Sequence, residues 1–102
     1  MIKALVAEAL GTFSWVGAVC AAMLVTGEGN FSVSAIIATA LCAGFTIAAM
    51  TAALRALSSC HFNPAVSLAA VIAGQLGPGR AAGYVLAQVF GGALAALFVF
   101  LA

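Results

Sequence analysis

Three long stretches without a charged residue constrain this chain more than any other feature of its sequence. They cover residues 9–27, 31–54 and 81–102. Each is close to the ~20 apolar residues that a helix needs to cross a ~30 Å hydrocarbon core. We therefore predict an all-α membrane protein with three transmembrane helices, at residues 4–26, 32–56 and 80–101.

The composition argues against a soluble domain. Of the 102 residues, 67% are hydrophobic and 5% are charged, whereas soluble domains have about 25% charged residues. Three cations cannot form the basic patch that binding to nucleic acid requires. A secretory signal is the less favoured interpretation of the first span, because Glu8 interrupts an apolar stretch that is too long for one.

The segment between the second and third spans is too short to cross a membrane. Its apolar run extends from Ala65 to Ala73, and ~10 helical residues at ~1.5 Å each reach about half of the hydrocarbon core. The Gly- and Pro-containing residues 74–79 end this run. We predict a non-helical re-entrant loop at 57–62 and a re-entrant half-helix at 63–73. All elements belong to a single membrane domain, residues 1–102.

The placement of charges predicts an orientation. With a cytoplasmic N-terminus, Lys3, Arg55 and Arg80 all lie on the cytoplasmic side and Glu28 lies outside, as the positive-inside rule prefers. Three spans put the C-terminus outside, so a following repeat would be inverted, which is a common design of transport proteins. We predict an integral protein of the plasma (cell inner) membrane.

Asn63 and Pro64 indicate how the half-helix begins. Asn is a strong N-cap residue and Pro favours the first helical position. The Asn63 side-chain oxygen would accept a hydrogen bond from the N–H of Ala65 or Val66. Its NH₂ group would then be a rigid donor beside the positive end of the helix dipole, near the middle of the membrane.

The residues before Asn63 complete the pattern. Non-helical backbone at this depth is tolerated only where it is buried in protein or lines water. The carbonyls of 58–62 are therefore natural acceptors for a file of water, and the helix end would repel cations. The pattern predicts a pathway for a small neutral solute. Mere capping of an ordinary helix is the usual interpretation in a soluble protein, but the flanking spans disfavour it here.

Three motifs together resemble the aquaporin and glycerol-facilitator family over essentially the whole chain. The segment His61-Phe62-Asn63-Pro64-Ala65-Val66 resembles the family's first signature loop, Ala7–Phe13 its first helix and Tyr84–Gly92 its third. The resemblance implies one inverted repeat, the N-terminal half, of a six-helix channel. The family's second half, with its own Asn-Pro-Ala loop and selectivity arginine, does not occur in these residues.

The resemblance also implies roles for individual residues. It assigns the pore lining to Ser59, Cys60, His61, Phe62, Asn63 and Ala43, the first four through their carbonyls. Ala43 falls where water-selective members carry Phe and glycerol-selective members carry Trp, so the constriction would be wider. Ser59 and Cys60 stand where the family favours Gly or other small residues, which accept backbone angles that others resist.

Structural roles fall to Glu8, Pro64, Ala65 and Gln88. Glu8 would be a buried brace of the pore loop, partnered by His61 or by loop amides, because an intramembrane carboxylate costs about 2.5–3.5 kcal/mol. The alternative is a side chain that snorkels near the helix end. Gln88 would tie the third span to loop backbone or make a single interhelical hydrogen bond. The small residues Gly83, Ala87 and Gly91 are spaced for helix packing.

Two functions of different class remain. The leading one is a channel for water or small neutral solutes. The alternative is a truncated, non-conducting membrane half, suggested by the apolar residues at the end of the chain. One half cannot enclose a pore, so we expect a second half-channel, of the same or a different chain, in a higher oligomer. The one-sided cations argue against insertion in both orientations.

An enzyme is disfavoured, and no cofactor is expected, because Cys60 and His61 are adjacent and no acidic or metal-ligand cluster joins them.

Overall fold

The computed structural model describes all residues, 1–102, and its regular elements are all helices. Three are long: α1 (Ile2–Thr26), α2 (Val33–Leu54) and α4 (Pro78–Leu101). The fourth, α3 (Pro64–Ile72), is short. The three long helices are long and apolar enough to cross a membrane. These elements confirm the predicted fold class, three candidate spans with one short helix.

The ends of the helices lie within two residues of the predicted ones. Helix α1 begins at Ile2 rather than at 4, and α2 ends at Leu54 rather than at 56. Helix α4 begins at Pro78 rather than at 80, because proline lacks an N–H and fits the first turn. Asn63 and Ala73, the predicted ends of the half-helix, are the two caps of α3.

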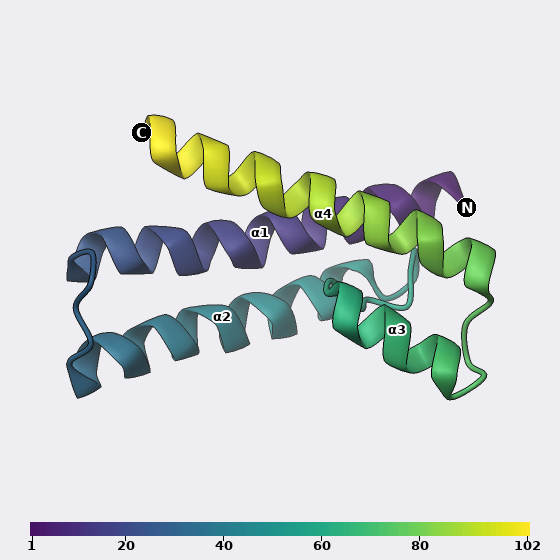
Figure 1. Ribbon diagram of the computed structural model, residues 1–102, viewed down its shortest axis with the longest axis horizontal. Coiled ribbons are helices and arrows are strands. Elements are labelled where there is room, and N and C mark those ends of the chain that lie inside the picture. The colour runs from purple at the N-terminus through teal and green to yellow at the C-terminus, as the bar shows by residue number, and fades with distance from the viewer.

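Helix α1 is the centre of the packing. It contacts α2 on one side and α4 on the other, α3 contacts α4, and no other pair of helices packs together. Figure 1 shows that α1 and α4 run in one direction and α2 in the other, so the two termini lie at opposite ends of the molecule. This arrangement has the odd number of candidate spans that the sequence predicts.

Helix α3 covers only part of the length of the molecule. Its nine residues correspond to about 14 Å of helix. In Figure 1 it begins near the middle of the long axis and extends back to the end where α4 begins. The segment between α2 and α3 leads the chain inward to that starting point. A re-entrant segment in a membrane would follow the same path.

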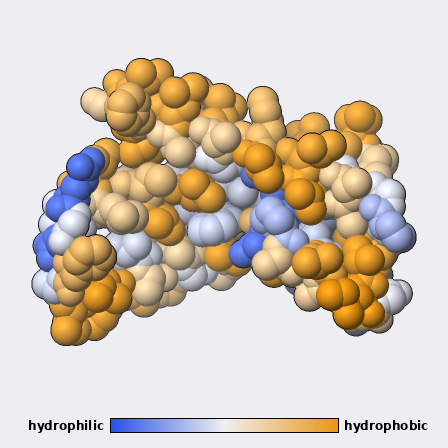
Figure 2. Space-filling model, viewed as in Figure 1, coloured by the Kyte–Doolittle hydropathy of each residue, from blue (hydrophilic) through white to orange (hydrophobic).

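Most apolar side chains face outward. Only 15 of the 102 residues are buried, and large residues such as Phe45, Leu86 and Phe100 are exposed. In Figure 2 hydrophobic residues cover most of the visible face, while hydrophilic ones gather near its middle and at the α1–α2 loop. This surface suits contact with lipid or with further protein rather than with water.

Small residues allow α1 and α4 to approach each other closely. A Cβ atom on Gly91 would collide with the backbone carbonyl of Ala9, and one on Gly83 would lie 3.1 Å from the side chain of Leu5. Both glycines therefore face α1, in agreement with their predicted role in packing.

We expect Gly91→Ala to lower the free energy of unfolding by about 1–3 kcal/mol, because the added methyl group forces two helix backbones apart. Gly92→Ala is the matched control. A Cβ there would make ordinary contacts, at 3.6 Å, with methyl groups of Thr12 and Val16. Reversible unfolding of the purified chain in mixed micelles measures both. Equal stability of the two variants would contradict close packing at Gly91.

Candidate functional site

The carboxylate of Glu8, on α1, gathers four hydrogen-bond donors. Its side chain is fully buried. Oε1 accepts from the N–H of Phe62 at 2.8 Å and from Nε2 of Gln88 at 2.8 Å. Oε2 accepts from the hydroxyl of Ser58 at 2.6 Å and from the N–H of His61 at 3.2 Å. One side chain on α1 thus joins the loop and α4. Because Glu8 is buried, its side chain does not snorkel toward the helix end, which was the alternative that the sequence left open.

Two loop residues adopt the left-handed conformation that favours glycine. The φ angle is 54° at Cys60 and 55° at Phe62, which costs a non-glycine residue about 1–2 kcal/mol. The loop is held there by its contacts: the N–H of Cys60 donates to Oγ of Ser58 at 3.0 Å, and the next two N–H groups donate to Glu8. The sequence predicted glycine-like angles at Ser59 and Cys60; Cys60 has one and Ser59 does not, and the angle at Phe62 was not predicted.

Phe62 lies in the core rather than beside an open path. The residue is 1% exposed, and its ring fills the space where a Cβ of Gly11 would be. Its carbonyl accepts from the indole N–H of Trp15 at 2.8 Å, whereas the sequence assigned this carbonyl to the pore lining. Trp15 was not predicted from the sequence as a partner of the loop. The sequence could have indicated Trp15, because a buried indole N–H needs a hydrogen-bond acceptor.

The carbonyls of Ser59, Cys60 and His61 form no hydrogen bond within the chain. A trans peptide is planar, so the carbonyl of one residue points opposite to the N–H of the next. The N–H groups of His61 and Phe62 point to Glu8, and therefore the carbonyls of Cys60 and His61 point away from it. Three successive acceptors are left outside the network.

Asn63 caps α3 in the predicted way. Its Oδ1 accepts from the N–H of Ala65 at 2.9 Å, and its backbone carbonyl accepts from the N–H groups of Val66 and Ser67. Pro64 occupies the first helical position. Nδ2 of Asn63 forms no hydrogen bond within the chain. Its NH₂ group is thus a free donor beside the positive end of α3.

Further polar contacts connect α3 and α4 to the loop. Oγ of Ser67 lies 3.0 Å from Nε2 of Gln88 and 2.9 Å from Nδ1 of His61. Gln88 therefore bonds the side chains of Glu8 on α1 and Ser67 on α3. Of the two interpretations that the sequence left open, the structure has interhelical hydrogen bonds and no bond to loop backbone. The hydroxyl of Tyr84 accepts from the N–H of Ser59 at 3.2 Å. Ser67 and Tyr84 were not predicted from the sequence, although each is a polar residue one turn from a predicted site residue.

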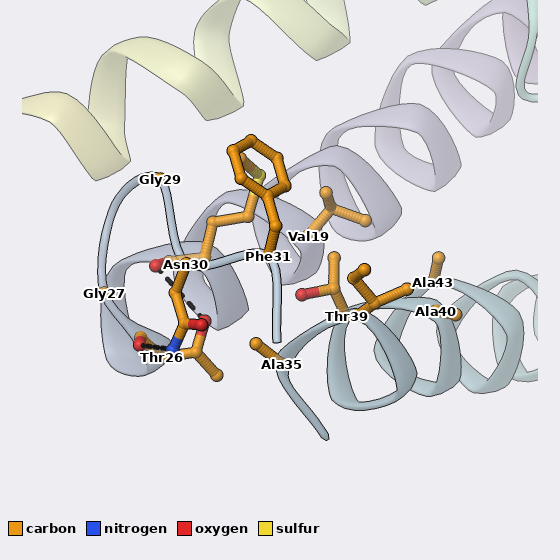
Figure 3. A pocket seen from close by; sticks show the side chains of 12 residues that line it. Val19, Thr26, Gly27, Gly29, Asn30, Phe31, Ala35, Thr39, Ala40 and Ala43 are labelled. Atoms are coloured by element: carbon orange, nitrogen blue, oxygen red, sulfur yellow. Dashed lines mark hydrogen bonds between the residues drawn. The ribbon is translucent and has the colours of Figure 1, made fainter. Parts of the chain in front are cut away.

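Ala43 lies apart from these residues. It lines a cavity of about 350 Å³ between α1 and α2, near the loop that joins them. Figure 3 shows Ala43 with Val19, Phe31 and Thr39 around this cavity. The structure thus does not bring Ala43 together with the residues before α3.

Comparison with known proteins assigns the chain to a family. The model of the family described as Major intrinsic protein matches residues 1–102. The chain belongs to this family. The match supports the family and the N-terminal half that the three sequence motifs predict. No solved structure matches the chain. A major intrinsic protein with three such apolar helices is an integral membrane protein.

Individual relatives match most of the chain. The Neurogenic protein big brain of Drosophila melanogaster is 36% identical over 98 residues, which are 96% of this chain and 14% of that protein. Aquaporin Z of Bradyrhizobium diazoefficiens is 32% identical over 101 residues, 98% of this chain and 42% of the relative. Aquaporin A of Dictyostelium discoideum is 37% identical over 93 residues, 87% and 32% of the two chains. The chain thus spans less than half the length of each relative.

We expect Glu8→Ala to speed amide exchange at His61 and Phe62 by about 10–100-fold. Each N–H loses a charged acceptor, which is typically worth about 1.5–3 kcal/mol. Hydrogen–deuterium exchange in micelles measures the effect. Glu28→Ala is the control, because that carboxyl is exposed in the α1–α2 loop. Unchanged protection at both amides in the Glu8 variant would show that Glu8 does not hold the loop.

Proposed function

We propose that this chain is a channel module for the passive passage of water or small neutral solutes, and that it contributes one Asn-Pro-Ala pore loop. The supporting observation is the series of free polar groups, the carbonyls of residues 59–61 followed by the NH₂ of Asn63. They lie in a molecule that is otherwise covered by apolar side chains. Polar backbone without a partner persists in a membrane protein where it lines water.

These groups have the chemistry to conduct a neutral solute. Water can donate to the carbonyls of Ser59, Cys60 and His61, and its oxygen can accept from Asn63. At Asn63 both hydrogens of that water must point away from the donor, which breaks a wire of proton transfer. A cation is repelled by the NH₂ group and by the positive end of α3. The carbonyl of Phe62 is not part of this series, because it accepts a hydrogen bond from Trp15. The buried ring of Phe62 instead anchors the loop in the core.

A second half-channel, from the same or a different chain, would complete the pore within a higher oligomer. Helix α3 packs only on α4, and α2 does not contact α4, so the loop region is not enclosed by this chain. The named relatives have more than twice the matched length. On its own, the chain would be the non-conducting half that the sequence left as the alternative.

The proposed location is the plasma (cell inner) membrane, and the proposed orientation has the N-terminus in the cytoplasm. Lys3 near the start of α1 and Arg80 near the start of α4 lie at the same end of the molecule (Figure 1). The loop with Glu28 lies at the other end. Cations on one side favour the cytoplasm for that side.

We expect Asn63→Asp to lower solute flux by about tenfold or more, because a carboxylate has no hydrogen to donate. Asp is as good an N-cap as Asn, so α3 should remain intact. Gln75→Glu is the control, since it makes the same chemical change on an exposed residue outside the loop. Stopped-flow shrinkage of proteoliposomes measures flux, with the chain alone or with the remaining part of aquaporin Z. Unchanged flux in the Asn63 variant would contradict the proposal.

We expect mercuric ion to block this flux in the wild type and not in Cys60→Ser. The thiol of Cys60 is half-buried in the loop, with its Sγ 3.7 Å from the carbonyl of Ser58. Cys42→Ser is the control, because Cys42 is exposed on α2 and its loss should leave the block unchanged. A block that persists in Cys60→Ser would separate this residue from the path.

A further inference from the structure

His61 is the single histidine of the chain, and it ends a series of side-chain contacts that begins at Glu8. The series continues through Gln88 and Ser67 to Nδ1 of the ring. Each of these groups has a fixed number of hydrogens to donate and of lone pairs to accept with. The contacts therefore determine which ring nitrogen of neutral His61 carries the hydrogen.

The orientation of the Gln88 amide comes first. The amide atom that faces Oε1 of Glu8 lies 2.8 Å from it. An amide oxygen at that distance would repel a carboxylate, so the atom is the NH₂ nitrogen. The same nitrogen lies 3.0 Å from Oγ of Ser67. Its two hydrogens thus serve Glu8 and Ser67, and the Ser67 hydroxyl accepts.

The single hydrogen of the Ser67 hydroxyl then has one destination. Ser67 is fully buried, and apart from Gln88 its Oγ contacts only Nδ1 of His61, at 2.9 Å. If Nδ1 carried a hydrogen, Ser67 would accept twice and its own buried O–H would have no acceptor, which is unfavourable. When Ser67 donates to a bare Nδ1, both the Ser67 hydroxyl and Nδ1 are satisfied, whereas Oε1 of Gln88 has no partner in either tautomer.

We propose that Ser67, set by Gln88, holds neutral His61 in the tautomer with hydrogen on Nε2, so that His61 is a second hydrogen-bond donor beside Asn63. Nε2 forms no hydrogen bond within the chain, and the ring is only partly buried. The rings of His61 and Tyr84 pack in a T-shaped arrangement, with centroids 5.4 Å apart. Ser67 and Gln88 are positioning residues, because they act through His61.

The transport role of this donor rests on the function proposed above. With Nε2–H and the Asn63 NH₂ both donating, this part of the path favours solutes that can accept hydrogen bonds, such as water and small alcohols. It disfavours ammonium, which can only donate. The other tautomer would offer a lone pair at Nε2 instead.

The tautomer is measured directly by ¹⁵N NMR of the histidine ring, in micelles and with the ring neutral. Because there is one histidine, the signals need no further assignment. We expect the Nε2–H form to exceed the Nδ1–H form by at least about tenfold in the wild type. In Ser67→Ala the ratio should fall toward unity, whereas Ser67→Thr keeps the hydroxyl and the ratio. Ser34→Ala, on an exposed serine of α2, should change nothing.

A wild-type ring with hydrogen mainly on Nδ1, or an unchanged ratio in Ser67→Ala, would overturn the proposal. Flux in proteoliposomes tests the transport role separately. If Ser67→Ala alters the tautomer but not the flux, while Asn63→Asp lowers the flux, the donor role of His61 is wrong and the channel function stands. If the wild type conducts nothing with any second half, the proposed function and the transport role fail together, and the tautomer assignment stands on the NMR result.

Discussion

The buried carboxylate of Glu8 is the interaction on which the loop depends. Its four donors come from the loop and from α4, and they hold a backbone that would otherwise avoid the left-handed angles of Cys60 and Phe62. The same bonds turn the carbonyls of Cys60 and His61 outward. A single acidic side chain thus satisfies the inner side of the loop and leaves its acceptors available on the other side.

Close helix packing makes this geometry possible. Glu8 can meet Gln88 because α1 and α4 approach at Gly91, where even a methyl group would collide with backbone. The ring of Phe62 can lie beside α1 because Gly11 leaves space for it. Small residues in the helices and polar residues in the loop are therefore two parts of one arrangement, as is common in membrane proteins, where polar groups need partners inside the protein.

Much of the architecture could be predicted from the sequence, because uncharged stretches of a set length have few alternatives in a membrane. The cap at Asn63 was equally accessible, since it is a local interaction between neighbours. The partners of Trp15, Ser67 and Tyr84 were not. Their contacts join residues from different elements, such as the bond of Trp15 to Phe62, and periodicity gives no information on which elements meet.

The contacts of Glu8 also set an order of assembly. Its partners lie 50 to 80 residues further along the chain. When α1 enters the membrane during synthesis, its carboxylate has none of them. A hairpin of α1 and α2 alone would carry an uncompensated acidic group, at a cost of about 2.5–3.5 kcal/mol. Only the arrival of α4, with the loop drawn inward, completes the set, so residues 1–102 mature as a unit rather than helix by helix.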